Sequence, residues 1–232
     1  MLNFFKRTAS AEAGAKPGGK VLARVPYYFA AALLWAAVVV QSGFVFAAND
    51  PRQCILEAGG AVDKSDVAAF ERQVDVDAIL EQALNLFVRR AQDPEAAKDL
   101  PPMVALLFTQ AASKEGNVRS LLLNETRAFV LNGISSGAFA GRKPSGNTAQ
   151  GLLAPLFADA STGRKEIKNV GQARRDGEAW LVPFVVHDAG NGESYDVTGR
   201  VTSVKGEMRL TSVANMESLL RRVAAESRTV EP

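Results

Sequence analysis

Few side chains in this chain are suited to catalysis, and most of them lie close together in the sequence. His187 is the only histidine, and Asp188, Tyr195 and Asp196 follow shortly after it. A histidine that acts as a general base needs a nucleophile and an orienting group within hydrogen-bond reach. Alternation along a strand puts Tyr195 and Asp196 on opposite faces, so only one of them can share such a site. We expect His187 to be a polar strand-end residue, and we retain His187 and Tyr195 as candidate ligand-pocket residues.

Glu125 is the third candidate for a ligand pocket. It lies between Leu122 and Phe129 on one helical stripe. A buried carboxylate has a raised pKa and can mark a functional site, whereas a glutamate at the edge of the stripe is the more common arrangement. One histidine and one cysteine do not make a metal-ligand cluster, and the Gly190-Asn191-Gly192 spacing lies in a turn rather than in a phosphate-binding loop. The sequence therefore predicts no catalytic residue set, no metal and no cofactor.

Helical signals dominate the part of the chain that precedes these residues. Ser65 and Asp66 offer an N-cap for a short helix, because both side chains can accept a backbone N–H. Asp75 then precedes an apolar stripe that closes at Arg89-Arg90, where two cations suit the negative end of a helix. Further helices are predicted at Met103–Ala112, Val118–Ile134 and Thr148–Ala160.

From Arg164 onward the apolar residues recur with the period of strands. The run Trp180–His187 is apolar on both faces and contains Pro183, which belongs at an edge or a bulge because it has no N–H. In the next run Tyr195 and Val197 alternate with polar residues, as expected of a strand with one buried face. Turn residues at Lys205-Gly206 predict a tight hairpin.

The outer strands and a final helix complete the predicted fold. Arg164–Ala173 and Glu207–Val213 supply the outer two strands of a four-stranded antiparallel meander, and Asn215 caps a helix over Met216–Ala225. Helices first, then consecutive strands, then a closing helix predict an α+β domain with helices packed on one face of a curved four-stranded antiparallel sheet.

The longest uncharged run of the sequence is Val25–Ala48. A helix of that length rises about 36 Å, enough to cross a hydrocarbon core of about 30 Å. Residues 1–24 carry a formal charge of +4, whereas residues 49–232 hold 22 basic and 24 acidic side chains. Because basic flanks stay in the cytoplasm, we expect a cytoplasmic tail (1–24), a transmembrane helix or signal-anchor (25–48) and an extracytoplasmic α+β domain (49–232). In a bacterium this places the protein in the inner membrane, with the C-terminal domain in the periplasm.

Cleavage of the apolar run is the alternative to a membrane anchor. Val45-Phe46-Ala47 satisfies the small-residue rule for a signal peptidase, so cleavage after Ala47 would release a soluble exported protein. The long basic region and the length of the apolar run favour the anchor. Pro51-Arg52-Gln53, before Cys54, lack the small apolar run that lipid attachment needs.

Cys54 is the only cysteine, so a disulfide within the chain is excluded. Two interpretations remain. Cys54 lies a few residues beyond the predicted membrane segment, where two copies could meet in an intermolecular disulfide. Free cysteine also commonly behaves as a small buried hydrophobe, which is the interpretation we favour.

The domain also contains local sequences that resemble a known class of proteins. These are Lys64–Phe70 beside Val74-Asp75, then Glu178–Val182, and then the hairpin Val204–Leu210. Over roughly residues 55–225 the chain resembles bacterial membrane-anchored domains of the nuclear-transport-factor-2-like, or cystatin-like, fold. In plan it is also similar to the inner-membrane scaffold subunit of type IV secretion systems, although the Asn-Pro-x-Gly turn of that subunit is absent.

These observations predict a function class rather than a reaction. Basic doublets are spread along the chain and balanced by acids, which argues against nucleic acid as a partner. We expect a non-catalytic interaction or assembly module whose partners are the lipid bilayer and other envelope proteins or a second copy. The alternative is a ligand-binding or enzymatic pocket between sheet and helices.

Overall fold

The computed structural model describes residues 50–97, 102–113, 117–143 and 163–228. These residues form an α+β fold with an antiparallel sheet, as the sequence predicts. The tail, the apolar run Val25–Ala48 and the predicted helix Thr148–Ala160 lie outside the described residues. Within the described ranges no helix combines the length and the apolar character that crossing a membrane requires.

Aspartates begin the first three helices. Asp50 caps α2 (Pro51–Lys64), Asp66 caps α3 (Val67–Gln73) and Asp75 caps α4 (Val76–Gln92), each by accepting a backbone N–H of the first turn. Ser65 has a different role from the predicted one. With a φ of 57° it is the left-handed C-cap of α2.

The later helices lie close to their predicted limits. They are α5 (Pro94–Ala97), α6 (Pro102–Ala112), α7 (Val118–Ser135) and η1 (Ala138–Ala140). α6 begins one residue earlier than predicted and α7 ends one residue later, whereas the short α5 and η1 were not predicted. On α7, Arg119 pairs with Glu81 of α4, and Arg127 pairs with Glu71 of α3 and Asp77 of α4.

The sheet contains five strands instead of the predicted four. β3 (Ala179–Asp188), β4 (Glu193–Val204) and β5 (Glu207–Val213) form a meander with the expected turn, in which Lys205 and Gly206 have φ values of 54° and 88°. Of the predicted first strand, Arg164–Ala173, only β1 (Lys165–Lys168) is a strand. The short β2 (Arg174–Asp176) follows the end of that range and was not predicted, and both β1 and β2 pair with β3.

Pro183 accounts for the gap between β1 and β2. The Gly171 N–H donates to the Pro183 carbonyl over 2.8 Å, so the edge of Pro183 that lacks an N–H faces the segment between β1 and β2. A continuous outer strand would leave one of its carbonyls without a donor there. The ladder is therefore interrupted opposite the proline, which confirms that Pro183 belongs beside an irregularity.

α4 covers the opposite edge of the sheet. The Gln82 side chain donates to the Val213 carbonyl (2.7 Å) and accepts the Val213 N–H (2.9 Å). The Asp75 N–H donates to the Leu210 carbonyl (2.9 Å). Backbone groups of β5 that would otherwise be available to another strand are thus satisfied by the helical layer.

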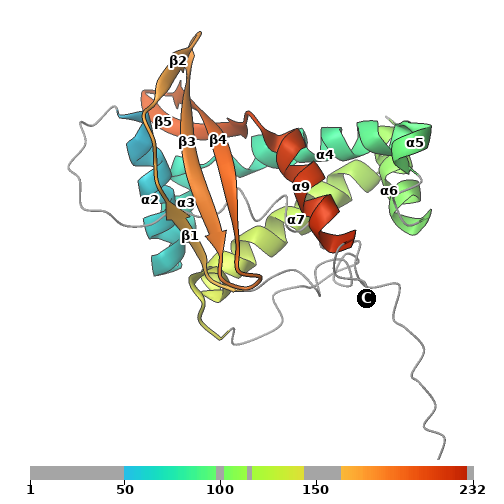
Figure 1. The fold of residues 1–232 in the computed structure, drawn as a ribbon, viewed down its shortest axis with the longest axis horizontal. Coiled ribbons are helices and arrows are strands. Elements are labelled where there is room, and N and C mark those ends of the chain that lie inside the picture. Colours follow the sequence, from blue (N-terminus) through green and yellow to red (C-terminus); the bar gives the residue numbers. More distant parts are fainter. Residues whose placement is uncertain (1–49, 98–101, 114–116, 144–162, 229–232) are drawn as a thin grey trace, which may run out of the picture.

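α2, α4 and α7 lie behind one face of the sheet, α9 (Met216–Arg228) lies beside β4, and among the described residues no helix covers the front, open face (Figure 1). On the covered face, alternate residues of β3 and β4 are buried, among them Phe184, Tyr195 and Val197. Gly199 leaves room there for Leu210, since a Cβ on Gly199 would lie 2.7 Å from Leu210 Cδ1. Apolar side chains from α2, including Ile55, pack against the covered face of the sheet.

The last helix, α9 (Met216–Arg228), follows β5 and contacts β4. Asn215 precedes it as predicted, but its side chain is used differently. Asn215 Oδ1 accepts the Thr198 N–H, and Nδ2 donates to the Asp196 carbonyl, both over 2.8 Å. Asn215 therefore extends the β4 ladder with its side-chain amide.

Candidate functional surfaces

A buried ion pair lies at the end of the sheet nearest the β3–β4 hairpin. Lys165 of β1 is opposite Asp188 of β3, and Lys165 Nζ is 2.6 Å from Asp188 Oδ1. Both residues are buried. Burial lowers the pKa of Lys165, and the attraction and hydrogen bond of Asp188 oppose that shift. Asp188 Oδ1 also accepts the Gly190 N–H, so this carboxylate organises the turn that follows β3.

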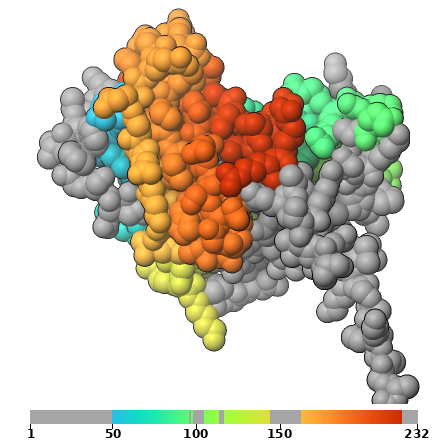
Figure 2. All heavy atoms as spheres, viewed as in Figure 1, coloured from blue at the N-terminus to red at the C-terminus, as the bar shows by residue number. Residues whose placement is uncertain are grey.

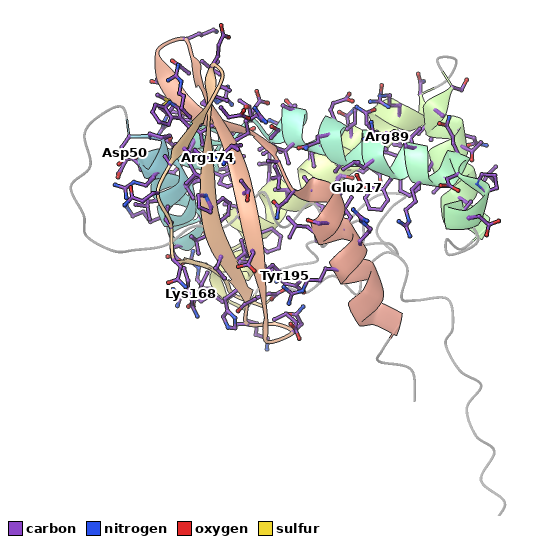
Figure 3. The ribbon with its side chains drawn as sticks, turned by 45° about the horizontal axis from the view of Figure 1, so that its top comes forward. Asp50, Arg89, Lys168, Arg174, Tyr195 and Glu217 are labelled. Atoms are coloured by element: carbon purple, nitrogen blue, oxygen red, sulfur yellow. The ribbon has the colours of Figure 1, made fainter. Side chains whose placement is uncertain are left out.

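Tyr195 links the same end of the sheet to α9. Asn191 Nδ2 donates to the Tyr195 hydroxyl over 2.8 Å. The Arg222 guanidinium lies 4.9 Å from the centre of the Tyr195 ring and 3.2 Å from a carboxylate oxygen of Glu193. Figure 3 shows Tyr195 at the hairpin end of the sheet, on the side where α9 lies. We call Lys165, Asp188, Asn191, Tyr195 and Arg222 the polar corner, and its polar groups bind one another.

The open face of the sheet is the second candidate surface. Figure 2 shows the strands uncovered on this side. On β3 it carries Leu181, Pro183 and Val185, and on β4 it carries Asp196, Thr198 and Arg200. At its β1 edge Lys168 donates to Glu166, which holds the pKa of that carboxyl below its ordinary value. The face thus has an apolar stripe within a polar surround.

The three candidate pocket residues do not share one surface. Tyr195 is 3 % exposed and faces the helices. His187 is on the open face, where Nδ1 is 3.0 Å from the Ser194 hydroxyl. Glu125 is half-buried on α7. Because His187 and Tyr195 lie on opposite faces of the sheet, no single pocket between sheet and helices can include both.

Cys54 lies inside the fold. It is 3 % exposed, its thiol donates to the Pro51 carbonyl over 3.3 Å, and burial raises its pKa far above the ordinary value. A protonated, buried thiol is a poor partner for a disulfide with another chain. This placement favours the interpretation of Cys54 as a small core residue.

The Lys165–Asp188 pair was not predicted from the sequence. The alternation of residues along a strand did carry a signal. Asp188 lies on the same face of its strand as the buried Phe184 and Val186, and Lys165 lies on the same face as Ile167. This alternation indicates that both charges lie on the covered face. Their position opposite each other depends on the register between β1 and β3, which the alternation does not give.

The remaining chemistry of the described ranges is sparse. They contain no group of three histidine, cysteine, aspartate or glutamate side chains arranged to hold a metal ion. Comparison with protein-family models, with curated proteins and with solved structures gives no match.

Proposed function

We propose that this chain is a single-pass inner-membrane protein that presents residues 49–232 outside the cytoplasm as a non-catalytic interaction or assembly module. The packing of the sheet is the observation that carries the proposal. Its covered face is packed with apolar side chains, including Ile55, Phe184 and Val197. A ligand-binding cone of this kind would need an unfilled interior lined by convergent polar groups.

The arrangement of the polar residues supports the same conclusion. In the polar corner, Lys165 and Asp188 neutralise each other, and Asn191 binds the Tyr195 hydroxyl. Buried polar groups that bind one another serve the fold rather than a ligand. His187 lies on the other face of the sheet, away from this corner.

The membrane part of the proposal rests on the apolar run Val25–Ala48 and its basic flank. The fold would begin directly beyond the bilayer, since Asp50 is already the cap of α2. The proposed resemblance to membrane-anchored domains of the nuclear-transport-factor-2-like fold agrees with this plan. It also agrees with surfaces that serve other envelope proteins or a second copy.

Crosslinking of the full chain in host membranes, followed by identification of the captured proteins, tests the proposed role. We expect adducts with another envelope protein or with the chain itself, and we expect them to disappear when membranes are dissolved in detergent at low protein concentration before crosslinking. Recovery of the monomer alone, together with a tightly bound metabolite, would contradict the proposal and support the ligand-pocket alternative.

A further inference from the structure

The open face of the sheet carries more apolar surface than a solvated face requires. An antiparallel strand with one wet face normally alternates apolar and polar residues. β4 follows this rule, with Asp196, Thr198 and Arg200 on the open face, but the central strand β3 presents Leu181, Pro183 and Val185 there. Pro183 is exposed although it lies in the middle of the sheet. Such a stripe within a polar surround is typical of a surface that another protein covers.

Two charges of this face, both on β4, are complementary to each other under a two-fold rotation. Asp196 and Arg200 lie two residues on either side of Thr198, on the same side of β4. Rotation by 180° about an axis through Thr198, in the plane of the face and across the strands, exchanges the two positions. Asp196 of one copy then lies opposite Arg200 of the other, and Val185 lies opposite Leu181. The same rotation places Lys168 opposite Arg174, two cations at the β1–β2 edge, so the part of the face that suits a two-fold symmetric contact is the part formed by β3 and β4.

The present partners of these charges allow such a contact. Within the described residues the Asp196 carboxylate has no hydrogen-bond or ion-pair partner, and only its backbone carbonyl is bonded, to Asn215. Arg200 pairs with Asp176 over 2.7 Å and is partly exposed, so its remaining N–H groups can donate to a second carboxylate. Glu166 and Lys168 neutralise each other at the rim.

We propose that two copies of this chain associate through their open sheet faces, with the β3 stripes in contact and with Asp196 of each copy paired to Arg200 of the other. The inference rests on the proposed role as an assembly module and names its partner as a second copy. Lys168 and Arg174, labelled in Figure 3, lie on the β1–β2 edge of this face, opposite Val185 and Leu181 of β3.

A charge exchange tests this pairing in the full chain, purified in detergent and measured by sedimentation. Asp196→Arg alone and Arg200→Asp alone should each weaken self-association by about tenfold, since the symmetry applies every change twice. The exchange Asp196→Arg/Arg200→Asp should restore it when Asp176→Asn is included in the same variant, because Arg200 pairs with Asp176 within one chain and an aspartate at position 200 would meet that carboxylate. Glu207→Arg, which reverses an exposed acid at the start of β5, controls for net charge and should have no effect. Failure of the exchange variant to recover association would overturn the proposed pairing.

Cysteine crosslinking in membranes tests the surface itself. Thr198→Cys lies on the proposed axis, and a short bismaleimide should join two copies there, while the exposed Ser135→Cys on α7 should give no dimer. Cys54 is buried and serves as the internal background. Capture of a different protein at position 198 would overturn the self-docking inference and leave the assembly role intact. A monomer with no captured protein at either position would overturn both.

Discussion

The Lys165–Asp188 pair determines how the hairpin end of the sheet responds to mutation. Two charges in a buried position are tolerated because each neutralises the other, and removal of one leaves the other without compensation. Asp188→Asn keeps an acceptor for the Gly190 N–H but removes the negative charge. We expect this change to reduce the free energy of unfolding by about 3–5 kcal/mol, measured by urea denaturation. Lys165→Met/Asp188→Leu should recover most of the loss, and a double variant as unstable as Asp188→Asn would contradict this account.

The same pair gives stability a pH dependence with a defined sign. The pKa of Lys165 in the folded state is below its ordinary value of 10.5, so the unfolded chain binds more protons. The contribution of this group to stability therefore increases as pH rises through the folded-state pKa, and it levels off above 10.5. Asp188→Asn removes the attraction that opposes the shift, so its rise should begin at a lower pH. Unfolding midpoints measured from pH 7 to pH 11 should show the difference, and parallel profiles would argue against it.

Gly199 tests the close packing of the covered face. A Cβ at this position would lie 2.7 Å from Leu210 Cδ1 and 3.1 Å from Phe184 Cε1. Gly199→Ala should therefore lower the free energy of unfolding by about 1–3 kcal/mol through overpacking. Gly60→Ala is a matched control, because it adds the same methyl group inside α2 with nothing within 4 Å, and should stabilise the protein by about 0.5–1 kcal/mol. Equal effects of the two changes would contradict the packing argument.

At the level of elements, Gln82 is the connection between α4 and the edge strand β5. It satisfies both backbone groups of Val213. Gln82→Ala should lower the free energy of unfolding by about 1–3 kcal/mol and speed amide exchange at Val213, which hydrogen–deuterium exchange can follow. Gln82→Glu keeps the acceptor and loses the donor, so we expect an intermediate exchange rate. Unchanged exchange at Val213 in both variants would show that Gln82 does not protect this edge.

The elements also show which features a sequence can predict. Helices such as α4 and α7 were placed within a few residues because caps and apolar stripes are local signals. The early end of the first strand at Lys168 and the separate β2 were not predicted, since both depend on which edge of Pro183 faces this part of the chain. The prediction that the Asn215 side chain caps α9 was wrong for a similar reason, because its Oδ1 accepts the N–H of Thr198 from β4 instead. Among the site residues, alternation placed Tyr195 and Asp196 on opposite faces, whereas the Lys165–Asp188 pair required the register.

For the whole molecule, the proposed topology makes a direct prediction. A reporter that is active only in the cytoplasm, fused after Pro232, should remain inactive, because a basic tail favours a cytoplasmic N-terminus. Replacement of Lys16, Lys20 and Arg24 by glutamine should increase the reporter signal by weakening that preference. Strong activity with the unaltered tail would reverse the orientation. N-terminal sequencing of the purified protein completes the test, since a start near Ala48 would indicate cleavage.

The interruption opposite Pro183 limits the assemblies that the described fold can build. Addition of strands edge to edge needs a long, unbroken row of free backbone groups, and β1 and β2 offer only two short pieces separated by Asn169–Ala173. At the other edge the Gln82 amide occupies the corresponding groups of Val213. With both edges of the described sheet obstructed, neither edge offers neighbouring copies a template for open-ended fibre growth. Contacts between open sheet faces remain available, and such a contact is complete once two copies have joined.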